Sequence, residues 1–180
     1  VAFDRPEKTF RHERVADYKA GRAEAPDILR QQMGLVREVI STLGFPIVDK
    51  AGIEADDIIA TLATQGRDAG HDVIIVTGDR DVYQLVCDPH VKVLYNKRGV
   101  SDYALYDEAG ILERTGVTPE KYVMYAAMRG DTSDNLPGVP GVGEKRRRGL
   151  LRAFGSVKRI KAATVDELAA VPGMSRVAAE

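Results

Sequence analysis

The sequence predicts an α/β domain built on a parallel sheet, followed by a small all-α module. Residues 73–77 are a continuous β-branched run, which is typical of a strand buried on both faces of a parallel sheet. Segments of strand and helix character alternate around it, as in βαβ units. After about residue 118 the strand signal disappears, and short helices are expected around two Pro-Gly turns. We therefore divide the chain into residues 1–135 and 136–180.

The first elements follow from apolar spacing and from helix start and stop signals. Residues 1–3 are expected to end a buried strand, which places Asp4 at its carboxyl end, where ligand sites of open α/β sheets lie. Residues 11–22 carry charge on every side and are expected to form a mobile loop or an exposed helix. Pro26 is expected to open an amphipathic helix that stops at Gly44.

Further elements alternate between strand and helix. Residues 45–48 predict a short strand, residues 54–70 a second helix, and residues 91–95 another strand. The residues of the second helix that we expect to pack inward are Ile58, Ile59, Leu62 and Ala63.

Composition limits the class of protein. The chain has 180 residues, 44% of them hydrophobic, so it is long enough for one core with a small appendage. It contains no apolar run of about 18 residues, so no membrane contact is expected. The single cysteine, Cys87, excludes an internal disulfide and a cysteine zinc cluster, and a cytoplasmic location is expected. The net charge of −1 conceals a basic run at residues 145–161, which suits a polyanionic partner.

Eight carboxylates fall in four clusters: Asp4; Glu54, Asp56 and Asp57; Asp79 and Asp81; and Asp131 and Asp134. Taken singly, each cluster has a structural explanation in a helix start, a turn or a cap. Taken together, they lie at strand ends or helix starts that face one edge of the predicted sheet. Neighbouring acids also repel one another, and a divalent cation relieves that repulsion.

Oxygen ligands without histidine or cysteine select hard ions, so the acids predict Mg²⁺ or Mn²⁺. This many acids is consistent with two ions. Two such ions activate a water and neutralise a phosphate in phosphodiester hydrolysis. The acidic pattern therefore indicates a metal-dependent nuclease.

Two Pro-Gly turns, at residues 139–143 and 171–175, form an internal repeat, and the first runs into the basic segment. Glycines and helix starts of this kind direct backbone amides at a phosphate, although such turns also merely join helices. The predicted DNA-binding residues are Gly138, Gly141, Val142, Gly143, Lys145, Arg146, Arg147, Gly173, Ser175 and Arg176. Because the turn is duplicated and followed by the basic run, DNA contact is the favoured interpretation. The basic run can at the same time be a solvated helix face, with an inner side formed by Leu150, Leu151, Phe154, Val157 and Ile160.

Tyr18, Lys19 and Arg22 lie in the charged segment before the first long helix. One interpretation is a flexible arch in which Tyr18 stacks a base and the two cations bind phosphate. The other is an ordinary charged loop, and the residues alone do not choose between them. Tyr95, Tyr103 and Tyr106 are expected to be packing residues.

Five motifs resemble the 5′-3′ exonuclease domains of bacterial DNA polymerase I, which belong to the flap-endonuclease family. The motifs are residues 3–4, 18–22, 54–57, 77–81 and 129–138, and the resemblance covers about residues 1 to 145. It implies a PIN-like α/β domain that cuts 5′ flaps and RNA primers in replication and repair, with two metal sites. By match, Asp4, Glu54, Asp56 and Asp57 surround the first ion, and Asp79, Asp81, Asp131 and Asp134 the second. Lys19 and Arg22 match the catalytic arch residues that engage the scissile phosphate.

The chain departs from this family in two places. The family begins with a strand that carries another metal-binding aspartate, and this sequence starts after it, so an incomplete first metal site is expected. From about Arg146, residues 146–157 and 169–175 instead resemble the tandem helix-hairpin-helix domain of the excinuclease C subunit. That change indicates either a natural fusion or a splice of two genes.

The leading hypothesis is a structure-specific 5′ nuclease acting on flapped, nicked or branched DNA, associated with the nucleoid. The rival hypotheses are a non-catalytic helix-hairpin-helix DNA-binding module with an incomplete metal site and an excinuclease-C-like repair fragment. An RNA-cutting PIN toxin is disfavoured, because such proteins have little use for a helix-hairpin-helix tail. The resemblance also implies a polymerase domain in the parent protein. It further implies a potassium or sodium ion on the carbonyls of a hairpin.

Overall fold

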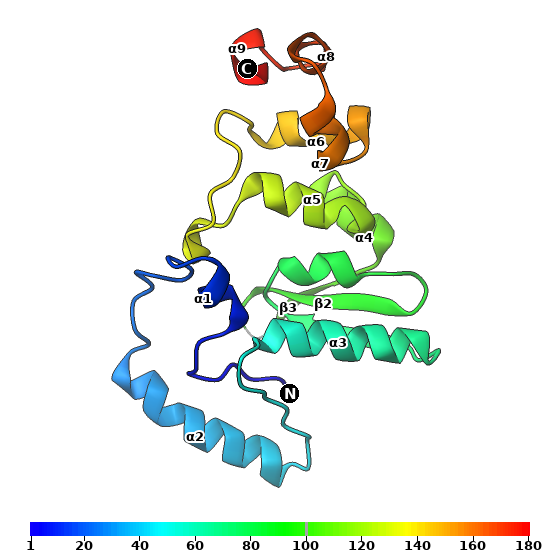
Figure 1. Ribbon diagram of the computed structural model, residues 1–180. Helices are drawn as coiled ribbons and strands as arrows, with labels where there is room; N and C mark the ends of the chain where they lie inside the picture. Colours follow the sequence, from blue (N-terminus) through cyan, green and yellow to red (C-terminus); the bar gives the residue numbers. More distant parts are fainter. Residues whose placement is uncertain (100) are drawn as a thin grey trace. The chain divides into compact units, whose positions relative to one another are not determined.

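Residues 1–99 and 101–180 are described from a computed structural model (Figure 1). They form two compact units. Unit 1 comprises Val1–Gln65 together with Ser133–Asn135, and unit 2 comprises Gly66–Thr132 and Leu136–Glu180. Helices combined with a sheet confirm the predicted α/β class.

Unit 1 contains α1 (Phe10–Arg14), α2 (Asp27–Thr42) and most of α3 (Ala55–Asp68). Its extended segments meet only at one parallel bridge, between Ala2 and Val48. There the Phe3 amide donates to the Val48 carbonyl at 3.1 Å, and the Val48 amide donates to the Val1 carbonyl at 2.9 Å. The predicted strands at residues 1–3 and 45–48 were wrong in extent, because one bridge leaves no further backbone pairs to extend a ladder.

Helix α2 forms where the apolar period and Pro26 predicted it, and Gly44 follows its end with a φ of 79°. None of its residues is buried, and its large apolar side chains other than half-buried Ile40 are exposed. Figure 1 shows it between two long connections. The apolar period therefore predicted the helix correctly, but this helix does not bury its apolar side chains in a core. In α3, Ile58 and Ala63 are buried as expected, whereas Leu62 is exposed, contrary to the prediction.

The sheet of unit 2 has the strand order β1-β2-β3, with β1 at Val73–Thr77, β2 at Val91–Arg98 and β3 at Asp102–Tyr106. Strands β1 and β2 run parallel, with Val73 opposite Val91 and Thr77 opposite Tyr95. Strands β2 and β3 are antiparallel. The predicted parallel sheet is present in the pair β1 and β2. Strand β3, which makes the sheet mixed, was not predicted from the sequence.

Strand β1 is buried on one face only. Ile75 is buried, while its neighbours Ile74 and Val76 are 60% and 63% exposed. Alternate side chains of a strand point to opposite faces, so this pattern marks one covered face. The prediction of burial on both faces was wrong, because a β-branched run reports strand propensity and leaves the number of covered faces open.

A tyrosine cluster forms the centre of unit 2. The short 3₁₀ helix η1 (Asp81–Leu85) places Tyr83 against Tyr95, Tyr106 and Tyr122, with ring centroids 5.5–5.9 Å apart. Tyr122 comes from α5 (Pro119–Arg129), and α4 (Glu108–Thr115) precedes it. Rings at these distances and tilts attract one another beyond their burial. The packing role predicted for Tyr95 and Tyr106 is confirmed, whereas Tyr103 is exposed.

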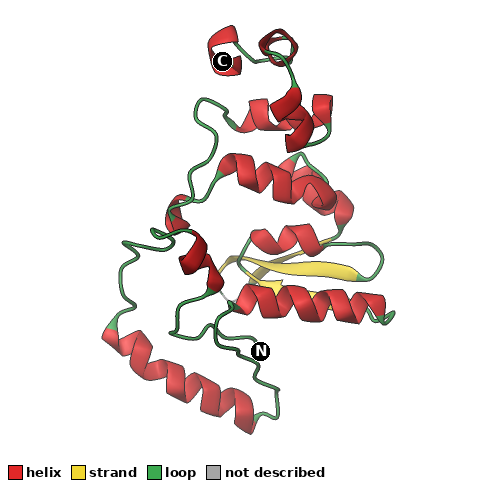
Figure 2. Ribbon diagram, in the orientation of Figure 1, coloured by secondary structure: helices red, strands yellow, loops and turns green. Residues whose placement is uncertain are grey.

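The last part of the chain consists of helices and loops (Figure 2). After the 3₁₀ turn η2 (Thr132–Asp134) come α6 (Glu144–Phe154), α7 (Val157–Ala162), α8 (Val165–Ala169) and α9 (Arg176–Ala179). Val142, Leu150 and Val171 are buried together, and Phe154, Ile160, Leu168 and Met174 pack against them. Both Pro-Gly turns thus contribute to one apolar cluster. These helices lie in the same compact unit as the sheet. The division of the chain between residues 135 and 136 stays a prediction.

No helix within residues 1–99 and 101–180 combines the length and the apolar character needed to cross a membrane.

Two glycines allow close backbone contact in the segment that matched the fifth motif. The Asp131 amide donates to the Leu136 carbonyl, and the Leu136 amide donates to the Asp131 carbonyl, both at 2.8 Å. A Cβ on Gly130 would lie 2.2 Å from the Gly138 nitrogen, and a Cβ on Gly138 would lie 2.1 Å from the Arg129 carbonyl oxygen. Glycine at both positions is therefore a packing requirement.

We expect Gly138→Ala to destabilise the protein by about 1–3 kcal/mol or more, because the new methyl group overlaps backbone atoms that must shift. Gly78→Ala is the matched control within unit 2, since a Cβ there meets nothing within 4 Å. It should change stability by at most about 0.5 kcal/mol. Chemical denaturation of the two variants tests this, and equal stabilities would contradict the close approach.

Candidate metal centre and nucleic-acid interface

Glu54 is the central acid of unit 1. It is 7% exposed, just before α3, and its carboxylate accepts from Lys19 Nζ at 2.8 Å and from Tyr18 Oη at 3.1 Å. Burial raises the pKa of Tyr18, and the Glu54 carboxylate adds to the effect, so the phenol remains a donor. Tyr18 is itself 5% exposed, and its ring lies edge-on to His12. Its predicted base-stacking role stays a prediction that requires exposure of this ring.

Segments far apart in the sequence meet around Lys19. Lys19 has a φ of 56°, and its amide donates to the Asp134 carbonyl at 3.1 Å. Asn135, with a φ of 58°, donates through Nδ2 to the Asp17 carbonyl at 2.9 Å and also to the Ala20 carbonyl. Left-handed backbone in residues other than glycine costs energy and persists where surrounding contacts require it. These contacts fix residues 17–22 against 133–135.

Arg22 completes this arrangement. Its Nε donates to the Ser133 carbonyl at 3.1 Å, and its Nη2 forms an ion pair with Asp134. The structure therefore joins both predicted catalytic cations, Lys19 and Arg22, to carboxylates of the predicted metal set. Asp134 lies with Glu54 in unit 1, whereas Asp79, Asp81 and Asp131 belong to unit 2.

The start of α3 collects the other acids of unit 1. Arg11 holds Asp57 through two parallel hydrogen bonds of 2.7 and 2.8 Å, and this contact is the main cause of the lowered pKa of Asp57. Asp57 also accepts from the Glu54 amide at 2.9 Å, which caps the helix. Asp4 accepts from the Ala55 amide at 2.7 Å, and Asp56 lies in the first turn.

In unit 2, the turn after β1 places Asp79 and Asp81 together. The Asp81 amide donates to Asp79 Oδ1 at 2.8 Å, and Arg129 Nη2 lies 3.4 Å from Asp81 Oδ1. Burial raises the pKa of Asp81, and the charges of Asp79 and Asp131 raise it further, while Arg129 opposes them. This excess of negative charge suits a divalent cation.

Among residues 1–99 and 101–180, no group of three or more His, Cys, Asp or Glu side chains is close enough to hold a metal ion. The predicted ligands instead lie in separate small groups. In unit 1, Arg11, Lys19 and Arg22 form ion pairs with three of these carboxylates. The donor chemistry fits a hard ion, because the predicted ligands are all carboxylates. The assignment of the eight acids to two ions stays a prediction.

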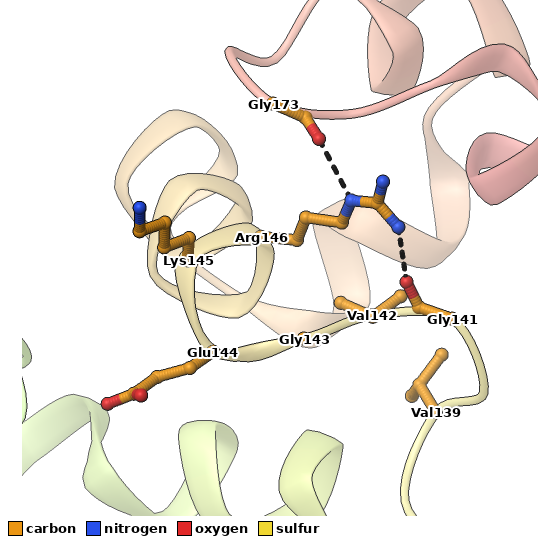
Figure 3. Close-up of a pocket in the computed structure, with 8 residues that line it drawn as sticks. All are labelled: Val139, Gly141, Val142, Gly143, Glu144, Lys145, Arg146 and Gly173. Atoms are coloured by element: carbon orange, nitrogen blue, oxygen red, sulfur yellow. Dashed lines mark hydrogen bonds between the residues drawn. The ribbon is translucent and has the colours of Figure 1, made fainter.

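Arg146 connects the two Pro-Gly turns. Its Nε donates to the Gly173 carbonyl at 2.8 Å, and its Nη1 donates to the Gly141 carbonyl at 2.5 Å. Figure 3 shows Arg146 between the turns and Lys145 pointing away from it. The hollow here is about 730 Å³ and is lined by Val139, Gly141, Val142, Gly143, Glu144, Lys145, Arg146 and Gly173. Exposed Lys145 and the start of α6 can reach an approaching phosphate.

Other predicted DNA contacts have partners inside the protein. Arg147 donates to the Val142 carbonyl at 2.8 Å and lies over the Tyr125 ring. Arg176 pairs with Asp166 at 2.8 Å, and Ser175 caps α9 through the Ala178 amide. DNA contact by these residues stays a prediction, and for Arg146 and Arg147 the structure adds a role in holding the turns.

Arg11 and Arg129, the cations that hold Asp57 and Asp81, were not predicted from the sequence. Arg129 also donates to Tyr122 Oη at 3.2 Å, which ties Asp81 to the tyrosine cluster. Arg129 is the first residue of the fifth motif, which was the available signal. The sequence gives no comparable signal for Arg11, since a charged residue in a charged segment is ordinary.

Comparisons with known proteins point to one family along nearly the whole chain. Residues 1–116 match the N-terminal resolvase-like domain of 5′-3′ exonucleases, and residues 117–177 match the C-terminal SAM fold of 5′-3′ exonucleases. DNA polymerase I of Mycobacterium bovis is 45% identical over 173 residues, which are 96% of this chain and 19% of that protein. The chain therefore spans about a fifth of the length of such relatives. The match also runs past Arg146, through the segment that resembles the excinuclease C module.

Solved structures agree with this fold. The T5 5′-exonuclease bound to divalent zinc superposes with a TM-score of 0.77 at 25% identity, covering 99% of this chain and 67% of that one. A flap endonuclease of bacteriophage T5, in a complex with DNA and metal ions, gives 0.75 at 25% identity, covering 99% and 66%. These likenesses confirm the expected PIN-like fold with a helical module.

The Arg11–Asp57 pair predicts a pH dependence of stability. The folded pKa of Asp57 is below the ordinary 3.8, so its stabilisation is present above pH 3.8 and is lost as the pH falls through the folded pKa. Asp57→Asn keeps a side-chain acceptor for the Glu54 amide but loses the charge. We expect it to cost about 1–3 kcal/mol at pH 7 and progressively less in acid.

Asp68→Asn is the control, because Asp68 is exposed at the end of the same helix and pairs with the adjacent Arg67. Denaturation in EDTA at several pH values compares both variants with the parent. A cost of Asp57→Asn that stays constant into acid would exclude the ion pair as its cause.

Proposed function

This chain belongs to the 5′-3′ exonuclease family, and on that premise we propose that it hydrolyses DNA phosphodiesters at 5′ ends and 5′ flaps with divalent metal. One observation carries the proposal: the motifs around Lys19, Glu54 and Asp134 are joined in unit 1 by direct contacts. Such contacts concentrate acids for metal and cations for phosphate in one place. The proposed setting is DNA replication and repair in the cytoplasm, at the nucleoid.

The predicted carboxylates favour Mg²⁺ or Mn²⁺ as the ions, since both prefer oxygen ligands. When bound, two ions would supply an activated water and neutralise the scissile phosphate. The cationic side chains next to these carboxylates pair with them when no metal is bound, and they would separate from them when metal binds. Lys19 and Arg22 now bind Glu54 and Asp134, so a metal that takes these carboxylates frees both cations to bind the substrate phosphate.

The Pro-Gly turns are proposed to hold the duplex part of the substrate. Exposed Lys145 and the amides at the start of α6 provide contacts to backbone phosphate that do not depend on base sequence. Binding should therefore weaken steeply with salt. The excinuclease-C-like origin of residues 146–175 stays a separate proposal about ancestry. Either origin is compatible with the proposed contacts to backbone phosphate.

A potassium ion on hairpin carbonyls is a finer proposal. Arg146 already donates to the Gly141 and Gly173 carbonyls, so this chain supplies a cation of its own at that place. A polymerase domain in the parent protein is likewise proposed, from the length of the relatives.

The rival function is a DNA-binding module without catalysis. It predicts binding that survives EDTA and no cleavage in Mg²⁺ or Mn²⁺. The mutual neutralisation of acids and cations within unit 1 is the observation in its favour, because a charge-balanced cluster is stable without metal.

We expect Asp131→Ala to reduce cleavage of a 5′-labelled flap duplex by roughly 100-fold or more, because it removes a carboxylate from the proposed metal set. DNA binding should change little. The control is Asp102→Ala, an exposed acid at the start of β3 outside that set. Assays in Mg²⁺, in Mn²⁺ and in EDTA separate the outcomes: metal-dependent product lost only in Asp131→Ala supports the nuclease, and binding without product in any variant favours the rival.

We expect Arg146→Ala to make DNA binding sensitive to the choice of monovalent cation, since it frees two carbonyl oxygens that a potassium ion can take. Fluorescence anisotropy with a nicked duplex, in potassium or tetramethylammonium chloride at equal ionic strength, measures this. The parent chain should bind similarly in both salts, and the variant several-fold more weakly in tetramethylammonium. If DNA binding by both proteins depends equally on the monovalent cation, Arg146 does not take the place of a bound potassium ion.

A further inference from the structure

Unit 2 contains a second hollow, of about 350 Å³, next to the tyrosine cluster. It is lined from four elements, and its principal side chains are Arg80, Arg114, Arg129, Arg147, Tyr83 and Tyr122. None of these residues belongs to the proposed metal ligands. The volume lies at the lower end of the range of small-molecule sites.

The charge of this hollow is strongly positive. Four arginines line it against one acid, Glu144, which is paired with Arg148. Of the four, Arg129 also pairs with Asp81 outside the lining. Like charges collected around a concave space repel one another unless an anion enters. The arrangement therefore favours a ligand of negative charge.

Two buried polar atoms at this hollow have no hydrogen-bond partner among the described residues. They are Tyr83 Oη, on a side chain that is 0% exposed, and Arg147 Nε. A guanidinium nitrogen only donates, and a phenol that is protonated at neutral pH readily donates. Leaving such donors unsatisfied is unfavourable, so acceptor oxygens that reach them stabilise the site. Because both atoms have almost no exposed surface, the lining has to shift before a ligand can contact them.

The surrounding side chains are already held in place. Arg114 donates to Tyr106 Oη at 2.9 Å and lies over the Tyr95 ring at 4.8 Å. Arg129 donates to Tyr122 Oη at 3.2 Å. Donors fixed before binding lose little conformational freedom when a ligand arrives.

We propose that this hollow is a binding site for a phosphate monoester dianion, such as inorganic phosphate or the terminal phosphate of a 5′-mononucleotide. Phosphate offers several acceptor oxygens and the charge that arginines recognise through paired hydrogen bonds. The proposal stands on the lining of the hollow and does not depend on the proposed nuclease function.

The first test is calorimetric titration of the full chain with inorganic phosphate, in a chloride buffer with EDTA so that no metal site contributes. We expect a single site. Tyr83→Phe keeps the ring and removes one donor, and it should weaken binding about tenfold or more. Tyr103→Phe is the matched control, because Tyr103 is exposed on β3 and does not line the hollow.

Arg80→Gln is a second variant, chosen because exposed Arg80 is not needed for the tyrosine packing, and it should also weaken binding. Deoxyadenosine 5′-monophosphate should bind and deoxyadenosine should not. Oligonucleotides with and without a 5′-phosphate then distinguish a free ligand from the end of a DNA strand. Absence of phosphate binding, or equal binding by the parent and both variants, would overturn the proposal and leave the hollow as a hydrated cavity.

Discussion

Repulsion between neighbouring carboxylates is the constraint on which the candidate site depends. Three of the four sets of acids are paired with a cation from a distant segment, through Arg11 on Asp57, Lys19 on Glu54, Arg22 on Asp134 and Arg129 on Asp81, while Asp4 accepts from the Ala55 amide. A partly buried acid without such a partner shifts its pKa upward or destabilises the fold. The contacts that hold the motifs together are therefore the same contacts that make the acids tolerable without metal.

This balance also explains how one cluster can serve both stability and chemistry. Lys19 and Arg22 neutralise carboxylates when no ion is present, and a divalent ion that takes over that task releases them. The carboxylates stay neutralised in this exchange, because one positive charge replaces another at the same carboxylate. The hydrogen bonds from the Lys19 amide to the Asp134 carbonyl and from Asn135 to the Asp17 and Ala20 carbonyls hold the two segments together, and they do not involve the exchanged charges.

The sequence predicted the local elements of the fold better than their surroundings. The helix at residues 27–42, the helix after Glu54 and the strand at residues 73–77 follow from apolar period and β-branching, which are local signals. The exposure of Ile74 and Val76 was not predictable, because it depends on whether another element covers the second face of β1. Strand β3 was missed because its pairing with β2 is set by tertiary contact.

For the site, sequence reasoning identified the residue types but could not identify their partners. Carboxylates in matched motifs were visible as a set, since spacing and order are properties of the chain. Two of these contacts depend on how distant segments meet: the hydrogen bond of buried Tyr18 to Glu54 and the ion pair of Arg11 with Asp57. Those partners decide which predicted ligands are already neutralised.

Arginine uses its several donors in the same way in the C-terminal helices. Arg146 joins the carbonyls of Gly141 and Gly173, and Arg147 holds the Val142 carbonyl, so the basic run stabilises the turns as well as offering charge. A guanidinium that bonds protein carbonyls through some of its donors keeps its full charge and its remaining N–H groups for a ligand. Internal contact and phosphate binding are therefore compatible roles, because they use different donors of the same side chains.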